Sequence, residues 1–460
     1  MNTPAKLRIA WLTLLLVALA VTPGVLRQPV LAQATAWTEP VLIFEGEGET
    51  RLPTLTADKY GQVHAFWVYR PPGDVDGLIY YTRLDQINAQ PVDILLAEAQ
   101  GLISTAGAGG LAVFWNGSQY SLAGPSPQVS ARPWDAPQKL ASSYFNGGVA
   151  TGPDDALWVL YGSNTSNAVF VQRLDPQLFY WDDPQLVANV SNPSSAPDAL
   201  RLAIGPDRSL HAVWTEYQLP TGWPPRGLYY ARSADGGLSW SLPREIANGL
   251  YNQPNVLAAP NGHVYIAWTG AAGTGGKYIQ ESPDGGQTWL PIVAVLPPPR
   301  GGSEGAPNME LDSAGNLHIV VSNLGCVWHL SREASTDTWF APECISTQSA
   351  WIENPAMTLG LGNQIHVVYW TDARQLWYTT RTLDAPAIDP LPLPTPAPPT
   401  PTVIVPTAVP LPTATPLPDF GPLPEPGQAS QAGVWALAAG AAPAGLLLLA
   451  VLIQRLGRRR

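Results

Sequence analysis

The side chains best suited to bind or transform a polar ligand are a small set of arginines, acids and one tyrosine. Only 13% of the 460 residues are charged, against about 25% in an ordinary globular domain, so such groups are easy to single out. A guanidinium group presents a planar fork that can hold a carboxylate through two hydrogen bonds, and a carboxyl group can accept or donate a proton. The candidates are Arg51, Asp74, Asp76, Glu216, Tyr217, Arg226, Glu304 and Arg374.

These candidates fall near the ends of short apolar strands that recur along the chain. Seven similar units can be aligned, each with an opening segment, a turn, an alternating apolar strand, a second short strand and a segment that begins with Trp and contains Pro. The apolar strands are predicted at 63–67, 111–115, 157–161, 210–214, 264–268, 317–321 and 365–369. Third strands are predicted at 78–81, 228–230 and 376–378. Four strands per unit predict an all-β fold, a propeller of seven blades.

The last unit lacks its outer strand. Units one to six end in Trp-containing segments such as 240–243, whereas the seventh runs into a proline-rich stretch at Leu383 and Asp384. A matching segment, 37–43, stands near the other end of the chain. We expect it to complete the seventh blade and so remove an exposed sheet edge. A six-bladed ring is the alternative and would require two units to merge.

Two octapeptides, 233–240 and 282–289, match the pattern S-x-D-x-G-x-x-W. A short Asp can bind the N–H groups of its own turn, Gly supplies a positive φ, and Trp packs beneath the loop. This is the Asp-box (BNR) motif, and the sequence around it resembles the sialidase-like superfamily of β-propellers. The resemblance places the boxes on the face opposite the active site, in structural roles. The residues concerned are Ser233, Asp235, Gly237, Trp240, Ser282, Asp284, Gly286 and Trp289.

Unit one resembles part of the exo-α-sialidase site. The segment 50–55 is similar to the motif [FY]-R-I-P, whose arginine grips the sialic acid carboxylate, although Thr50 stands where the family has an aromatic residue. The resemblance implies carboxylate binding by Arg51 and proton transfer by Asp74 or Asp76. The alternative is that Arg51 is a structural arginine that pairs with a neighbouring blade.

The remainder of the sialidase set is incomplete. The segment 303–308 resembles the strand that carries a catalytic Glu, which implies this role for Glu304, but no Arg follows at 320–323, where the family has one. Retaining sialidases also need a Tyr nucleophile, for which Tyr217 and Tyr369 are the candidates. The further ligand-binding candidates are Arg226, Arg374 and Glu216.

Two functions therefore stay open. The first is a cell-surface propeller that recognises glycan or protein ligands through the face opposite the Asp boxes, without hydrolysis. The alternative is a membrane-tethered exo-α-sialidase that cleaves terminal sialic acids, so whether the chain is an enzyme is left undecided. Neither function requires a cofactor. The net charge of −11 argues against nucleic acid as a partner.

Metal binding is not expected. Four histidines, His64, His211, His318 and His366, recur at the same place in different units. Equivalent positions in different blades are spread around a ring, so these side chains cannot converge on one ion. They are predicted to play a repeated structural role at the strand surface, and the chain has no zinc-type ligand spacing.

The ends of the chain predict export and membrane attachment. Residues 1–34 have the basic start, apolar stretch and small-residue site of a signal peptide, with an uncleaved anchor as the alternative. The propeller is assigned to 35–385, a Pro/Thr-rich disordered stalk of polyproline II type to 386–430, a transmembrane helix to 431–454 and a basic cytoplasmic tail to 455–460. This predicts a single-pass protein of the cell membrane whose propeller is extracytoplasmic. The segment 423–427 also resembles a surface-sorting signal, which leaves transfer to the envelope open.

Cys326 and Cys344 are the only two cysteines. They fall on strands predicted to be antiparallel neighbours flanking one hairpin, and export permits oxidation. A disulfide is expected, with two buried thiols as the alternative.

Overall fold

The computed structural model describes most of residues 36–393. The predicted signal peptide, most of the stalk, the transmembrane helix and the basic tail lie outside the described residues. Within 36–393 the positions that are not described are 75–76, 87–91, 98–101, 108–109, 116–118, 124–137, 140–146, 164–166, 176–179, 220–224, 271–274, 297–304, 324, 349–350 and 373. The part of the chain that is described holds no helix long and apolar enough to cross a bilayer.

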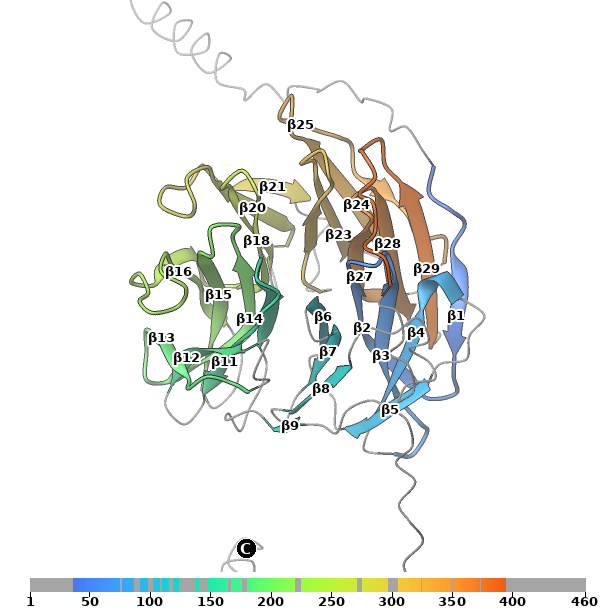
Figure 1. Ribbon diagram of the computed structural model, residues 1–460, viewed down its shortest axis with the longest axis horizontal. Coiled ribbons are helices and arrows are strands. Elements are labelled where there is room, and N and C mark those ends of the chain that lie inside the picture. The colour runs from blue at the N-terminus through green and yellow to red at the C-terminus, as the bar shows by residue number, and fades with distance from the viewer. Residues whose placement is uncertain are drawn as a thin grey trace, which may run out of the picture. The chain divides into compact units, whose positions relative to one another are not determined.

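The described chain folds into antiparallel sheets (Figure 1). In chain order, the first three sheets contain β2 (Glu49–Ala57), β3 (Val63–Arg70), β4 (Gly77–Arg83) and β5 (Val92–Ala97); β6 (Ile103–Gly107), β7 (Gly110–Trp115), β8 (Gln119–Ala123) and β9 (Gln138–Lys139); and β10 (Gly148–Thr151), β11 (Leu157–Ser163), β12 (Ala168–Leu174) and β13 (Gln185–Asn189). The next two contain β14 (Ser195–Ile204), β15 (Leu210–Gln218), β16 (Pro225–Ser233) and β17 (Arg244–Asn248); and β18 (Tyr251–Ala258), β19 (Val264–Gly270), β20 (Lys277–Ser282) and β21 (Val293–Leu296).

The last two sheets depart slightly from this pattern. One contains β22 (Asn308–Leu311), β23 (Leu317–Asn323), β24 (Cys326–Glu333), β25 (Thr338–Trp339) and β26 (Glu343–Cys344), the last two both paired with β24. The other contains β27 (Ile352–Gly360), β28 (Gln364–Thr371), β29 (Gln375–Thr382) and β1 (Val41–Glu45). A single 3₁₀ turn, η1 (Leu84–Gln86), is the one helical element among the described residues. All the predicted second and third strands lie within these bounds.

Neighbouring sheets contact one another through their first strands. Along the series β2, β6, β10, β14, β18, β22 and β27, each strand contacts the next, and β27 contacts β2. Side chains also bridge sheets: the amides of Asn255 and Asn308 donate to the carbonyls of Pro307 (2.9 Å) and Pro355 (2.6 Å) in the sheet that follows. Such an arrangement of four-stranded antiparallel sheets is consistent with propeller blades.

The core lies between sheets, which explains why the second strands are apolar almost throughout. Strands β15, β19 and β23 are buried along nearly their whole length, because one face of each meets the preceding sheet and the other meets the following one. Fully buried residues of this kind include Trp67, Trp214 and Trp268. Removing such a side chain from water contributes roughly 2–3 kcal/mol.

The N-terminal strand pairs with the last strand, as predicted. β1 runs antiparallel to β29, with Val41 opposite Tyr378 and Leu42 opposite Trp377 (Figure 1). In two of the segments that begin with Trp the regular strand starts only after the proline: β1 starts at Val41, after Pro40, and β17 starts at Arg244, after Pro243. Proline has no N–H to donate to the ladder, but an isolated backbone bond already precedes it, from the Thr38 N–H to the Thr380 carbonyl (3.0 Å).

The repeated histidines are buried, not at the strand surface. Each of three imidazoles meets a tyrosine hydroxyl of the third strand: His64 with Tyr81 (2.9 Å), His211 with Tyr230 (2.8 Å) and His366 with Tyr378 (2.7 Å). His318 instead meets His329 (3.1 Å). Burial lowers the pKa of His211 and His366 to about 4, so these rings are neutral. These contacts agree with the predicted structural role, but the imidazoles are buried within the fold and do not lie at the strand surface.

Each Asp box closes a hairpin between a third and a fourth strand. The N–H of Gly237 donates to the Ser233 hydroxyl (2.8 Å), and the N–H of Ser239 donates to the Asp235 carboxylate (2.9 Å). Trp240 packs against the core. The second box makes the same bonds through Ser282, Asp284, Gly286 and Thr288, and the ring of Trp289 meets Tyr230 edge-on at 4.9 Å. The boxes are therefore structural, as predicted.

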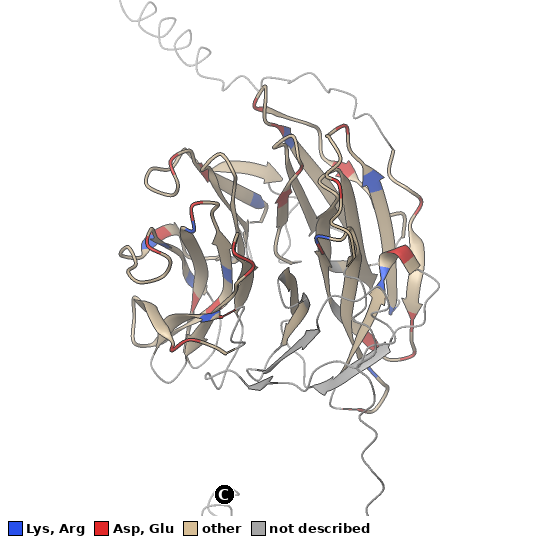
Figure 2. Cartoon of the chain, viewed as in Figure 1, with Lys and Arg blue, Asp and Glu red and all other residues tan. Residues whose placement is uncertain are grey.

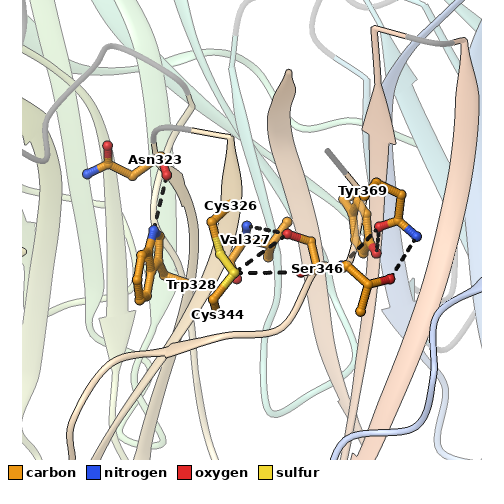
Figure 3. The surroundings of a disulfide bond; sticks show 9 residues. Asn323, Cys326, Val327, Trp328, Cys344, Ser346 and Tyr369 are labelled. Carbon is orange, nitrogen blue, oxygen red and sulfur yellow. Dashed lines mark hydrogen bonds between the residues drawn. A yellow bond between two sulfur atoms is a disulfide. The ribbon is translucent and has the colours of Figure 1, made fainter. Parts of the chain in front are cut away.

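The two cysteines form the expected disulfide (Figure 3). Cys326 opens β24 and Cys344 closes β26, with their Cα atoms 5.9 Å apart. Beside the bond, the Val327 N–H donates to the hydroxyl of Ser346 (3.1 Å). The covalent link thus holds β26 against β24, where only two residue pairs make the ladder.

The chain that follows β29 lies against the Asp-box face. We name residues 386–391 the C-terminal arm. Hydrogen bonds join the Ser313 hydroxyl to the Pro386 carbonyl, the Ile388 N–H to the Leu361 carbonyl (2.8 Å) and the Leu391 N–H to the Lys59 carbonyl (2.9 Å). The partners belong to turns of three different sheets. The arm was predicted as the first part of a free stalk, but these bonds make it part of the folded unit.

The Asp boxes should give the fold a characteristic acid sensitivity. Hydrogen bonds from Ser239 and Thr288 lower the pKa of Asp235 and Asp284 to about 2. Because the pKa is depressed in the folded state, the stabilisation is complete above about pH 4 and is lost as the pH falls toward 2. We expect the gap in unfolding free energy between wild type and Asp235→Asn/Asp284→Asn to shrink over that range. Urea unfolding measures it, and a constant gap would contradict the prediction.

The arm should be sensitive to Gly362. A Cβ on Gly362 would lie 2.7 Å from Ile388 Cδ1, whereas a Cβ on Gly262 would meet nothing within 4 Å, and both glycines have positive φ. Gly362→Leu and Gly262→Leu therefore share the backbone strain, but only the first displaces the arm. We expect faster hydrogen exchange of the Ile388 and Leu391 amides in Gly362→Leu alone. Equal exchange in both variants would refute the arm's docking.

Candidate functional site

A cavity of about 490 Å³ lies where the first and last sheets meet. Its walls come from the loop between β1 and β2, the turn between β3 and β4, and the turn between β28 and β29. In antiparallel sheets these connections lie at the ends opposite the Asp boxes. The lining residues are Glu47, Gly48, Glu49, Thr50, Arg70, Pro71, Pro72, Gly73, Asp74, Trp370, Thr371, Asp372 and Arg374.

A close backbone approach positions the first wall. A Cβ on Gly48 would lie 1.9 Å from the Arg70 carbonyl oxygen, so no other residue fits there without moving the chain. The Gly48 N–H donates to the Tyr69 hydroxyl (3.1 Å), and this ring lies against Phe44 of β1. The loop that leaves the closing strand is thereby held against the end of β3.

The opposite wall is fixed by the tight turn between β28 and β29. The Arg374 N–H donates to the Thr371 carbonyl (2.9 Å), and Arg374 itself adopts a positive φ of 65°. Asp372 is tied to Trp351, since its carboxylate accepts the Trp351 N–H (3.1 Å). The Arg374 guanidinium donates to the Glu47 carbonyl, which joins the two walls.

Acidic groups outnumber basic groups in the lining. Four carboxylates, from Glu47, Glu49, Asp74 and Asp372, accompany two guanidinium groups, from Arg70 and Arg374. Arg70 lies 3.5 Å from Glu49, and both side chains are partly exposed. Figure 2 shows acidic and basic positions interspersed over the sheets. Among the described lining residues, the cavity therefore carries an excess of negative charge.

Four lining residues have a buried polar atom with no hydrogen-bond partner within the described chain. They are Thr50 Oγ1, Arg70 Nε, Trp370 Nε1 and Thr371 Oγ1. Two of these, Arg70 Nε and Trp370 Nε1, can only donate, and the two hydroxyls can donate and accept. Buried polar atoms normally find a partner, because an unmade bond costs about 1–3 kcal/mol. These four atoms are closed off from solvent, so a ligand in the cavity would not reach them in this arrangement of the wall.

Only some of the predicted site residues meet in this cavity. Asp74 and Arg374 line it together. Asp76 and Glu304 lie outside the described residues, as does the side chain of Arg51. The proton transfer predicted for Asp74 or Asp76, the catalytic role of Glu304 and the carboxylate contact of Arg51 therefore stay predictions.

The Arg51-Leu52-Pro53 segment belongs to a repeated bulge. Pairing between β2 and β3 shifts between Arg51 and Thr54, and the same shift occurs at Asn252/Asn255 and at Glu353/Ala356. A proline lies in each of these bulges, at Pro53, Pro254 and Pro355. The proline that suggested a sialidase motif thus has a structural explanation that applies to several sheets.

Three other candidates lie in the sheet of β14–β17 and do not line the cavity. Glu216 is only 1% exposed, and its carboxylate accepts the N–H of Ser191 at 2.9 Å and the Ser191 hydroxyl. It anchors a loop, which differs from the ligand contact predicted for it. Tyr217 and Arg226 lie near the end of β15 and the start of β16, so the cavity does not unite Arg226 with Arg374.

Tyr369 is unsuited to be a nucleophile. It is fully buried, its hydroxyl donates to Gln348 (2.6 Å; Figure 3), and burial raises its pKa. A nucleophile needs the opposite shift. No tyrosine is among the described lining residues of the cavity.

Sequence reasoning missed Trp370, Thr50 and Thr371 as site residues. Their one sequence signal was position, since they stand at the ends of strands in the last and first units. In the described ranges, no group of three or more His, Cys, Asp or Glu side chains could hold a metal ion.

Comparisons with known proteins concern the fold. No protein-family model and no curated protein matches the chain. The chain is similar to the BP39L lectin of Burkholderia pseudomallei, with 15% identity, 76% of this chain and 99% of the lectin covered, and a TM-score of 0.54. It is also similar to a PL25 ulvan lyase bound to -[GlcA(1-4)Rha3S]-, with 7% identity, coverage of 76% and 96%, and a TM-score of 0.51.

A sialidase is among the similar structures as well. The Hadza microbial sialidase Hz136 shares 13% identity over 73% of this chain and 66% of the sialidase, with a TM-score of 0.44, too low to argue from. Together with the Asp boxes and the four-stranded sheets, the stronger similarities support the β-propeller fold that the sequence predicted.

The fold should lose stability when Gly48, in the first wall of the cavity, gains a side chain. Gly48→Ala places a carbon against the Arg70 backbone, and such overpacking costs about 2–3 kcal/mol. The control is Gly73→Ala in the other wall, where a Cβ would meet nothing within 4 Å, so its cost is about 1 kcal/mol of backbone strain. Chemical denaturation measures both. Equal destabilisation would show that the close approach is unimportant.

Proposed function

We propose that this chain is a carbohydrate-binding propeller of the cell surface, and that it binds glycans without hydrolysis in the cavity between its first and last sheets. The observation that carries the proposal is the polar lining of one cavity, in which four carboxylates and two guanidinium groups stand beside Trp370. Sugar hydroxyls can both donate and accept, so they suit this mixture of acceptors and donors. The cavity volume of about 490 Å³ is within the range of ordinary ligand sites.

Trp370 supports a sugar in particular. Trp370 is among the lining residues, and an aromatic ring offers an apolar surface on which a sugar ring can lie. A sugar ring has a mixed character, with apolar C–H groups and polar hydroxyls. The known lectin with the same fold is consistent with this proposal, although its own ligand does not transfer to this chain.

The charge of the cavity favours a neutral glycan over a sialylated one. Four carboxylates against two guanidinium groups would repel the carboxylate of sialic acid, since like charges in a partly enclosed site cost free energy. The Glu47 carbonyl and Glu49 already engage Arg374 and Arg70. We therefore place neutral sugars first among ligands.

Hydrolysis is the second candidate function, because the cavity does bring Asp74 together with two arginines. Retaining sialidases need in addition a tyrosine nucleophile beside a glutamate. The described lining contains no tyrosine, which places hydrolysis second.

The wider architecture is part of the proposal. The seven sheets of the described chain are taken as seven blades of one ring, supported by the series of contacts that returns from β27 to β2. The export signal at 1–34, the proline-rich stalk and the apolar segment 431–454 would display this ring outside the cell membrane.

Glycan-array binding tests the proposed ligand class. We expect neutral glycans to bind wild type, and Arg374→Ala to weaken binding about tenfold or more through loss of a charged hydrogen-bond donor. Arg208→Ala is the matched control, because Arg208 is also exposed and has a similar positive φ (66° against 65°) but lies in the turn between β14 and β15. Binding that is restricted to sialosides, or is unchanged by Arg374→Ala, would contradict the proposal.

Hydrolysis is tested separately with a fluorogenic α-sialoside. Wild type is expected to release no reporter above the level of Asp74→Asn. Turnover that Asp74→Asn or Arg51→Ala abolishes would establish the enzyme in place of the binding protein.

A further inference from the structure

A second cavity, of about 880 Å³, lies on the Asp-box face. It is formed by the ends of β18 and β22, the turn that follows each of them, and the C-terminal arm. Gly362 and Ile388 bring the arm's docking site into its wall. The cavity of the proposed glycan site lies at the opposite ends of the strands, so the two sites are separate.

Most of the second cavity's wall is apolar. The apolar lining includes Leu257, Pro260, Leu311, Ala314 and Ile388. Ile388 is 57% exposed although it belongs to a docked segment, so it has apolar surface left to cover. A ligand with an apolar body would gain free energy by covering such a wall.

Two carboxylates supply the only charges of the described lining, which contains no Lys, Arg or His. Asp312 is already engaged, since it lies 3.3 Å from His318 Nε2 and accepts the Asn316 N–H (2.8 Å). Glu310 accepts the N–H of Leu359 through Oε2 (2.7 Å) and has no ion pair among the described residues.

The burial of Glu310 is costly when it is ionised. Desolvation raises its pKa to about 7, because no nearby cation offsets the loss of water. A cation placed in the cavity would be attracted by this carboxylate in a medium less polar than water.

We propose that this cavity binds a small organic ammonium ion, with the ammonium group against the Glu310 carboxylate and the apolar body along Leu311 and Ile388. The charge of Glu310 and the absence of a basic group in the described lining select a cation. The apolar wall selects an organic cation over a strongly hydrated metal ion, which would need several oxygen ligands.

Hexylamine is the probe, and hexan-1-ol is its neutral analogue. The full-length chain in non-ionic detergent is titrated by calorimetry at pH 8, above the pKa of Glu310. We expect the amine to bind at least about tenfold more tightly than the alcohol, the ratio given by one charge-assisted hydrogen bond. Glu310→Gln should abolish this preference, since glutamine keeps an acceptor for Leu359 but loses the charge. Ile388→Ala should weaken both ligands.

Asp74→Asn, in the other cavity, is the matched control and should leave the preference for the amine unchanged. Equal affinities for amine and alcohol in wild type would overturn the proposal, and so would a preference that survives in Glu310→Gln. The wild-type comparison needs no variant, so the proposal is testable even if Glu310→Gln fails to fold. Neither outcome depends on glycan binding.

Discussion

The pairing of β1 with β29 is the constraint on which the site depends. The last sheet obtains its outer strand from the opposite end of the chain, and without it β29 would expose an edge open to pairing with other chains. The loop that leaves β1 then forms one wall of the proposed glycan cavity. Arg374 reaches across to Glu47, and Gln375 bonds the Glu45 side chain (2.9 Å). The cavity exists because the two ends of the fold meet there.

The two ends of the described part of the chain contact the junction of the first and last sheets from opposite faces. On one face, Gly48 lets the N-terminal loop approach Arg70. On the other, the C-terminal arm crosses from the turn of Ser313 to that of Lys59. Each sheet is held to its neighbours by apolar burial, but the junction has these additional backbone hydrogen bonds. No covalent connection joins β1 to β29, so the closure there rests on noncovalent contacts.

Features that recur from sheet to sheet form the scaffold, whereas the cavities are lined by residues that differ between sheets. Two features recur because the sheets that carry them pack against their neighbours in the same way. They are the histidine–tyrosine contacts and the proline bulges at Pro53, Pro254 and Pro355. Trp370 has no such counterpart: the residue in the equivalent register is Val68 in the first sheet and Thr269 in the fifth. A resemblance that rests on a repeated feature, such as Arg-x-Pro, therefore says more about fold than about chemistry.

The sequence by itself determined the strands, their grouping into units and the Asp-box hairpins, because these follow from local periodicity and turn chemistry. It also predicted the disulfide, and it predicted the pairing of the first strand with the last because the last unit lacks an outer strand. It also singled out Asp74 and Arg374. Only the tertiary structure decided that these two share a cavity with Trp370, that Glu216 is buried against Ser191, and that Ile388 is docked beside Glu310. Such contacts join residues far apart in the chain, so they depend on how the sheets meet and not on any local pattern.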